Sequence, residues 1–221
     1  MFDFLEGYDL LGAFWVTVQL TVYSALGSLI WGTLLAGMKV SPVPLMRGFS
    51  TAYVNVVRSI PLTVIMVFSS LGLFQTLSVS LGASDFADIN FRLAVLALVA
   101  YTAAFVCEAL RSGINTVPVG QAEAARALGL SFTQVLRLVV LPQAFRAVVN
   151  PLSNVLIALT KNTTVASAIG VAEASYLMKD MIEAEAQLML ISAVFAFGFV
   201  VLTLPTGLIL GWVSKKVAVK R

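Results

Sequence analysis

Histidine is absent from this chain of 221 residues, and cysteine occurs once, as Cys107. The absence of histidine removes the commonest general base and the commonest metal ligand. A single cysteine can form neither a disulfide framework nor a cysteine metal cluster. The chain also lacks the G-x-x-x-x-G-K-[ST] loop with which P-loop ATPases hold phosphates. These absences disfavour an enzyme, and an ATPase in particular.

Charged residues are scarce and apolar residues are abundant. Charged residues make up 11% of the chain, against roughly 25% in a soluble domain, and the mean hydropathy is +0.96. A helix needs about 20 apolar residues to cross the hydrocarbon core. Five stretches qualify, and they cover residues 11–38, 50–79, 91–110, 151–171 and 188–212. With no linker, repeat or low-complexity segment, residues 1–221 are expected to form one all-α membrane domain.

The distribution of charge predicts how these spans are oriented. With the N-terminus outside, ten basic residues fall in cytoplasmic segments and two, Arg92 and Lys179, fall outside. The positive-inside rule therefore favours an N-out, C-in protein with five spans. The acidic N-terminus, which includes Asp3 and Glu6, lacks a cleavage site, so no cleaved signal peptide is expected. The cytoplasmic basic residues are Lys39, Arg47, Arg111, Arg126, Arg137, Arg146, Lys215, Lys216, Lys220 and Arg221.

Two segments between the spans have helical patterns of their own. The cytoplasmic segment 111–150 predicts one helix over residues 121–130 and a second over residues 131–140, which Pro142 is expected to end or kink. The external segment 172–187 carries apolar residues at helical spacing among acids, which predicts an amphipathic helix on the outer surface. Gly27, Gly32 and Gly37 in the first span are candidates for close helix contacts.

The polar island in the cytoplasmic segment carries the most informative motif. It reads Glu123-Ala124-Ala125, then Gly129, and ends with Leu141-Pro142. A short helix with small side chains lets another surface approach closely. The spacing resembles the coupling loop of binding-protein-dependent ABC importers, in which the loop docks into the ATPase subunit. By that resemblance, all six residues are candidates for the ATPase-coupling site, with Glu123 near the N-terminus of the helix.

The resemblance extends over most of the chain. Residues 53–62 read YVNVVRSIPL, residues 101–120 read YTAAFVCEALRSGINTVPVG, and residues 151–170 read PLSNVLIALTKNTTVASAIG. These segments are similar to motifs of polar amino-acid permeases, and their residue sequences resemble those of the glutamate permeases of actinobacteria. The resemblance implies the type I ABC importer permease fold in a bacterial inner membrane, with glutamate as substrate. Glutamine, aspartate or another polar amino acid is the alternative.

The same resemblance implies partners. They are a P-loop ATPase dimer, an extracytoplasmic solute-binding protein and a second, homologous permease subunit, all working in membrane lipid and without nucleic acid. ATP and Mg would bind to the ATPase, so no cofactor is expected in this chain. A self-contained channel or secondary transporter is the competing class. Such a carrier would show an internal repeat and intramembrane acids, whereas this chain has no repeat and only Glu108.

Two cations fall inside the apolar stretches. Arg58 and Lys161 are predicted to lie near the bilayer midplane with no acid at the same depth, where a cation costs at least ~2.5–3.5 kcal/mol. Either they pair with backbone carbonyls, with Glu108 or with a partner subunit, or they attract a substrate carboxylate. Lys161 is followed by Asn162, Thr163 and Thr164, which add neutral donors to this candidate substrate pathway. Glu108 itself is expected to pair locally with Arg111.

Overall fold

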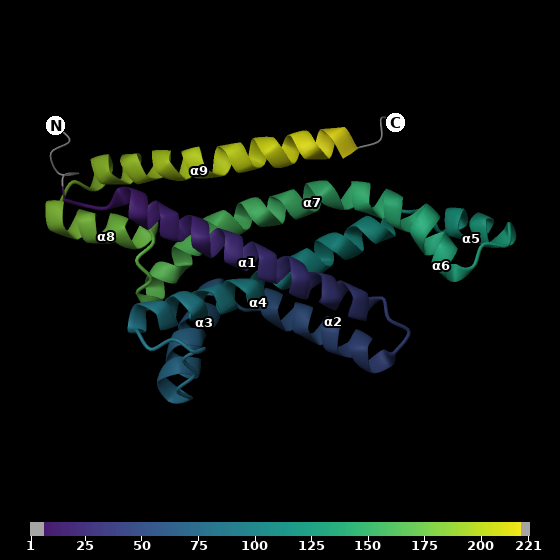
Figure 1. Cartoon of the computed structure of the whole chain (residues 1–221), viewed down its shortest axis with the longest axis horizontal. Helices are drawn as coiled ribbons and strands as arrows, with labels where there is room; N and C mark the ends of the chain where they lie inside the picture. Colours follow the sequence, from purple (N-terminus) through teal and green to yellow (C-terminus); the bar gives the residue numbers. More distant parts are fainter. Residues whose placement is uncertain (1–6, 218–221) are drawn as a thin grey trace.

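The computed structural model describes residues 7–217, and every regular element in that part is helical (Figure 1). The all-α prediction is therefore confirmed. Within residues 7–217, four helices are long and apolar enough to cross a membrane, and a bent pair supplies the fifth span if it is counted as one. The α-helices are α1 (Leu10–Lys39), α2 (Pro44–Ser59), α3 (Leu62–Val67), α4 (Phe86–Asn115), α5 (Val119–Ala127), α6 (Phe132–Val135), α7 (Leu141–Asn162), α8 (Ala174–Glu185) and α9 (Leu188–Val217).

The most extensive helix pairing joins α1 and α4, which run in the same direction. Gly27 of α1 faces Val99 of α4, and Gly32 faces Val106 one to two turns further along both helices. A Cβ atom on Gly32 would lie 2.6 Å from Val106 and 2.8 Å from the carbonyl oxygen of Ala103. Small residues let helix backbones approach in this way within a membrane. The contact expected of Gly27 and Gly32 is confirmed.

α4 is the most enclosed span. In its most apolar window 56% of the residues are buried, compared with 28% for α1 and 11% for α9. α1 covers one side of α4, and α7 covers another, where Gly113 packs closely on Val148. α9 lies along α7 at the edge of the bundle (Figure 1), and its exposed apolar residues suit contact with lipid.

The second predicted span is broken. α2 ends at Ser59, α3 begins at Leu62, and the two helices differ in direction by 104°. Pro61 explains the break because proline disfavours helical backbone at the preceding residue, and Ile60 is extended with ψ 131°. The predicted span over residues 50–79 is therefore a bent pair of helices and not one straight helix. α3 continues as a π-helix, Phe68–Thr76, so the span turns sharply rather than running straight.

The fourth span exists and is longer than predicted. One helical segment runs from Phe132 to Ile169 through a π-helical turn at Leu136–Val140. Pro142 does not end it, because the π-helical turn leads directly into α7, whose second residue is Pro142. The expectation that Pro142 ends the helix is wrong, and the alternative expectation of a kink stays a prediction. The segment closes as a 3₁₀ helix at Gly170, whose φ is 79°.

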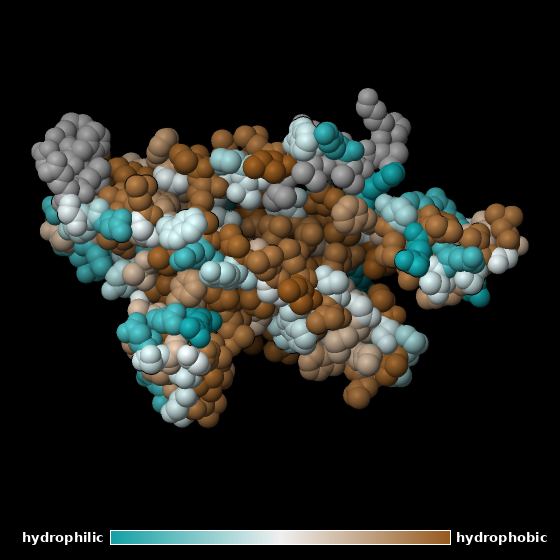
Figure 2. Space-filling model, in the orientation of Figure 1, coloured by the Kyte–Doolittle hydropathy of each residue, from teal (hydrophilic) through white to brown (hydrophobic). Residues whose placement is uncertain are grey.

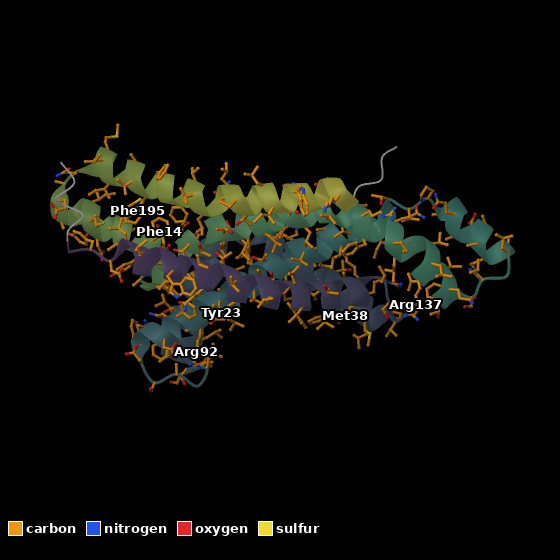
Figure 3. All side chains as sticks on the ribbon, turned by 45° about the horizontal axis from the view of Figure 1, so that its top comes forward. Phe14, Tyr23, Met38, Arg92, Arg137 and Phe195 are labelled. Atoms are coloured by element: carbon orange, nitrogen blue, oxygen red, sulfur yellow. The ribbon has the colours of Figure 1, made fainter. Side chains whose placement is uncertain are left out.

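Polar segments gather at the two ends of the molecule. The amphipathic α8 lies at the end where α9 begins, and α5 and α6 lie at the opposite end, beyond the middle of the bundle (Figure 1). Figure 2 shows hydrophobic residues dominating the middle of this face. At the α8 end, Phe14 stacks on Phe195 with 5.8 Å between ring centroids (Figure 3). Asp3, Glu6, Lys220 and Arg221, which contribute to the predicted orientation, lie outside the described residues.

The α1–α4 contact predicts a difference between two glycines of α1. Gly32→Ala should lower the free energy of unfolding by about 1–3 kcal/mol, because its new methyl group meets α4 backbone. Gly37→Ala is the matched control, since a Cβ atom there meets nothing within 4 Å. Thermal unfolding of the purified chain in detergent measures both. Equal melting temperatures for the two variants would contradict the proposed packing.

Candidate functional site

α5 is the only α-helix of eight or more residues between α4 and α7 in the described chain, and it carries most of the coupling motif. It begins at Val119, directly after Pro118, and ends at Ala127. Glu123 and Ala124 are exposed, whereas Ala125 is buried. Glu123 is the fifth residue of α5 and not part of its first turn. The predicted interaction of its carboxylate with the N-terminus of the helix is therefore wrong.

Gly129 ends α5 through its backbone conformation. The Gly129 N–H donates to the carbonyl of Arg126, and the Leu130 N–H donates to that of Ala125. These two bonds form a Schellman motif, which places the residue after the cap in the left-handed region. Gly129 has φ 86°, which glycine adopts at little cost. A Cβ atom on Gly129 would touch nothing within 4 Å of this chain, so the surface beyond it is open.

Large apolar side chains surround the end of α5 on the surface. Leu128 is 83% exposed and Phe132 is 74% exposed. The side-chain amide of Gln143 donates to Gln121, 2.6 Å away, and so ties α5 to the start of α7. Leu141 and Pro142 belong to the first turn of α7. The motif is thus divided between a surface helix and the membrane helix that it braces.

A groove of about 300 Å³ lies between α4 and α7. Its polar groups are neutral, and one of them, the Thr102 hydroxyl, is buried without a hydrogen-bond partner in the described part of the chain. Buried polar groups are normally paired, so the Thr102 hydroxyl is a candidate contact for a bound molecule. The lining residues are Tyr101, Thr102, Phe105, Asn154, Val155, Ala158 and Asn162.

The predicted substrate-pathway residues do not form one cluster. Asn162 lines the groove, whereas Lys161 is exposed and is not among the lining residues. Thr163 is fully buried and its hydroxyl donates to the carbonyl of Thr160, which makes it unavailable to a substrate. Thr164 donates to the carbonyl of Lys161. The expectation that Thr163 offers a free donor is therefore wrong.

Arg58 has an acidic neighbour. Its guanidinium lies 3.6 Å from one carboxylate oxygen of Glu108, and the other oxygen accepts a hydrogen bond from Lys39. Arg58 therefore has one of the structural partners that were left open for it, Glu108. The expected local pair between Glu108 and Arg111 is wrong, because the ammonium of Lys39 takes that place.

Glu173 is a buried carboxylate at the α8 end of the molecule. It caps α8 by accepting hydrogen bonds from the backbone N–H groups of Ser175 and Tyr176, at 2.9 and 3.0 Å. The Thr17 hydroxyl of α1 lies 3.5 Å from Oε2 of Glu173, to which it donates, and it accepts from the Ala174 N–H. Burial raises the pKa of Glu173 from 4.5 to about 7, although the backbone donors favour the charged form. Glu173 therefore joins α1 to α8 through a group that titrates near neutral pH.

Comparison with known proteins identifies the chain. Residues 28–219 match the family described as the binding-protein-dependent transport system inner membrane component. The chain belongs to this family. It is 58% identical over 220 residues to the glutamate transport system permease protein GluC of Corynebacterium efficiens, covering 97% of this chain and 96% of that protein. It is 37% identical over 158 residues to the glutamate/aspartate import permease protein GltK of Escherichia coli, covering 72% and 70%.

A solved structure supports the same assignment. The chain matches a structure described as "Crystal structure of an amino acid ABC transporter with histidines". The TM-score of this match is 0.83 and the sequence identity is 27%, and the match covers 94% of this chain and 93% of the other. The chain is thus a multi-pass permease subunit of the type I fold in the cell membrane. ATP hydrolysis belongs to a separate subunit. Family membership implies an ATPase, a solute-binding protein and a second permease as partners.

Several candidate site residues were not predicted from the sequence. Four of them lie in segments that resemble motifs of the permease family, but their uncharged side chains did not indicate a binding role in the sequence. They are Tyr101, Thr102, Phe105 and Asn154. Glu173 lies at the start of the segment 172–187, in which an amphipathic helix was predicted, and N-capping acids are common at such a start. Its burial depends on α1, more than 150 residues earlier in the chain.

The positive φ of Gly129 predicts how substitutions will affect coupling. Gly129→Val should cost about 1–3 kcal/mol locally, because a β-branched residue is strained there, and should weaken ATPase binding at least tenfold. Gly129→Asn is the matched control, since asparagine adopts the left-handed region more readily. Co-purification of the ATPase with each variant tests this. Equal loss in both variants would show that side-chain bulk, and not backbone conformation, is decisive.

Glu173 predicts a pH dependence at the α8 end. Between pH 4.5 and about 7 the folded chain keeps a proton that the unfolded chain has lost, so the free energy of unfolding falls as pH rises. Glu173→Gln keeps a capping oxygen but cannot titrate. Above pH 7 this variant should gain about 3 kcal/mol relative to the native chain, because each pKa unit of the shift corresponds to about 1.4 kcal/mol. A difference between the two proteins that stays constant from pH 5 to 8 would contradict the raised pKa.

Proposed function

We propose that this permease subunit carries glutamate in an ATP-driven, binding-protein-dependent importer. The observation that carries the proposal is the 58% identity, over almost the whole of both chains, to a protein named as a glutamate transport system permease. Import of glutamine, aspartate or another polar amino acid is the alternative within the same class.

The coupling surface consists of Glu123, Ala124, Leu128, Gly129 and Phe132. A loaded binding protein docks on the outer face, and ATP closes the ATPase dimer, which then moves α5. Because Gln143 holds α5 to α7, this movement reaches a wall of the groove. The groove then opens alternately to the two sides of the membrane. ATP and Mg would bind to the ATPase only, and the second permease would be a homologous, non-identical subunit.

Uptake into vesicles tests the proposal. The vesicles hold this chain, its partner permease, the ATPase and the binding protein, and labelled glutamate is supplied outside with ATP inside. Glutamate should accumulate only with ATP and the binding protein. Accumulation without the ATPase would favour a self-contained carrier. ATP-driven accumulation of glutamine or aspartate in place of glutamate would retain the class and change the substrate.

We expect the ammonium group of Lys161 to make the importer prefer anionic substrates. In the described part of the chain no carboxylate lies within 4 Å of its ammonium. At 4 Å and an effective dielectric of ~20, a charge pair is worth ~4 kcal/mol before desolvation, which offsets much of it. Lys161→Met should therefore lower glutamate uptake about tenfold without reducing assembly.

The control for Lys161→Met is Lys216→Met, which removes an ammonium lying 4.0 Å from the ring centroid of Trp212. Lys216→Met should leave uptake unchanged. If Lys161→Met fails to assemble, Lys161 is structural. If it assembles and transports glutamate with the native rate and apparent affinity, Lys161 plays no part in recognition.

A further inference from the structure

Three charged side chains meet where α1, α2 and α4 approach one another. Lys39 is the last residue of α1 and donates to Oε1 of Glu108 at 2.5 Å, while Nη1 of Arg58 lies 3.6 Å from Oε2. The two oxygens of Glu108 therefore face different cations at different distances. Lys39 is well enclosed, with 9% of its side chain exposed, whereas 46% of the Arg58 side chain is exposed.

Arg58 is held loosely compared with Lys39. A separation of 3.6 Å is beyond the range of a normal N–H···O hydrogen bond, so the contact with Glu108 is an attraction between charges. A guanidinium has five N–H donors, and no hydrogen bond from these donors is found in the described part of the chain. Arg58 thus keeps donors for a further carboxylate, which it can bind with two parallel bonds.

Phe105 connects this charge cluster to the groove. The Arg58 guanidinium lies over the Phe105 ring, 5.6 Å from its centroid, and Phe105 also lines the groove between α4 and α7. Phe105 and Glu108 are three residues apart on α4 and so lie on one face of the helix. Along α4 the order is Thr102, Phe105 and Glu108, which puts Glu108 nearest to α5.

The cluster of Lys39, Arg58 and Glu108 carries an excess of positive charge. Two cations face one carboxylate, so the group carries a net charge of about +1 at neutral pH. Glutamate, with two carboxylates and one ammonium, carries a net charge of −1 at that pH. An anionic amino acid next to Arg58 would neutralise the net positive charge of the cluster, whereas a cationic amino acid would increase that charge.

We propose that Arg58 binds a carboxylate of the substrate at the end of the groove nearest to α5, and that Glu108 then competes for the same guanidinium and lets the substrate leave. Phe105 keeps Arg58 beside the groove, and Lys39 keeps Glu108 within reach of Arg58. Arg58 is a binding residue in this scheme and Glu108 is a positioning residue. The inference rests on the proposed transport of an anionic amino acid.

The scheme predicts opposite effects for the two residues. Arg58→Met should raise the KM for glutamate uptake about tenfold or more, which is the effect of losing a charge-assisted contact. Arg58→Lys keeps the charge and should recover most of the affinity. Glu108→Gln should lower the KM and slow the maximal rate severalfold, because Arg58 then holds the substrate without competition.

The experiment uses the complete importer in vesicles and measures KM, maximal uptake rate and ATP hydrolysis for each variant. Arg92→Met is the matched control, because Arg92 is also an arginine of the membrane domain paired with a carboxylate, Asp88, 2.8 Å away. It should leave the KM within twofold of the native value. Hydrolysis stimulated by the loaded binding protein reports assembly independently of substrate release.

The outcomes separate this inference from the proposed function. If the native importer does not accumulate glutamate with ATP, the proposed function fails. If it does, and Arg58→Met leaves the KM within twofold, the inference is overturned. If Arg58→Met does not assemble, Glu108→Gln decides: a lower KM with a lower rate supports the competition, and an unchanged or higher KM rejects it.

Discussion

The close contact between α1 and α4 is the interaction on which the rest of the structure depends. Lipid offers little hydrophobic drive for helices to associate, so packing between small residues must supply it. Gly27 and Gly32 allow α1 to approach α4, and Lys39 at the end of α1 is thereby brought to Glu108. The same α4 carries Phe105 of the groove and leads into α5. One enclosed helix therefore connects the candidate substrate groove with the candidate coupling surface.

The positions of the spans could largely be predicted from the sequence, because apolar length alone decides whether a helix can cross a membrane. α1, Leu10–Lys39, agrees within one residue with the predicted stretch 11–38. Local backbone geometry was harder to predict. The second span bends by 104° at Pro61, whereas at Pro142 the helix continues from the π-helical turn into α7. Both are prolines in apolar surroundings, and only their position within a helix separates the two outcomes.

The candidate site could be predicted only in part. Gly129 and its neighbours were recognisable because the motif has a fixed spacing along the sequence, from Glu123 to Pro142. The partner of Glu108 was not, because sequence spacing favours the nearby Arg111 and the fold supplies Lys39, which is 69 residues away. The burial of Thr163 likewise depends on packing between distant helices. Packing between distant helices decides which charged residues pair inside a membrane. This packing could not be predicted from the single sequence.

Orientation is the claim that the functional account needs most, because α5 can meet an ATPase only in the cytoplasm. Cys107 is buried and can be replaced by alanine, after which Leu128→Cys on the α5 side and Glu183→Cys on α8 provide exposed single thiols. A membrane-impermeant maleimide should label Glu183→Cys in intact cells and Leu128→Cys only in inverted vesicles. Labelling of Leu128→Cys from outside intact cells would contradict the account.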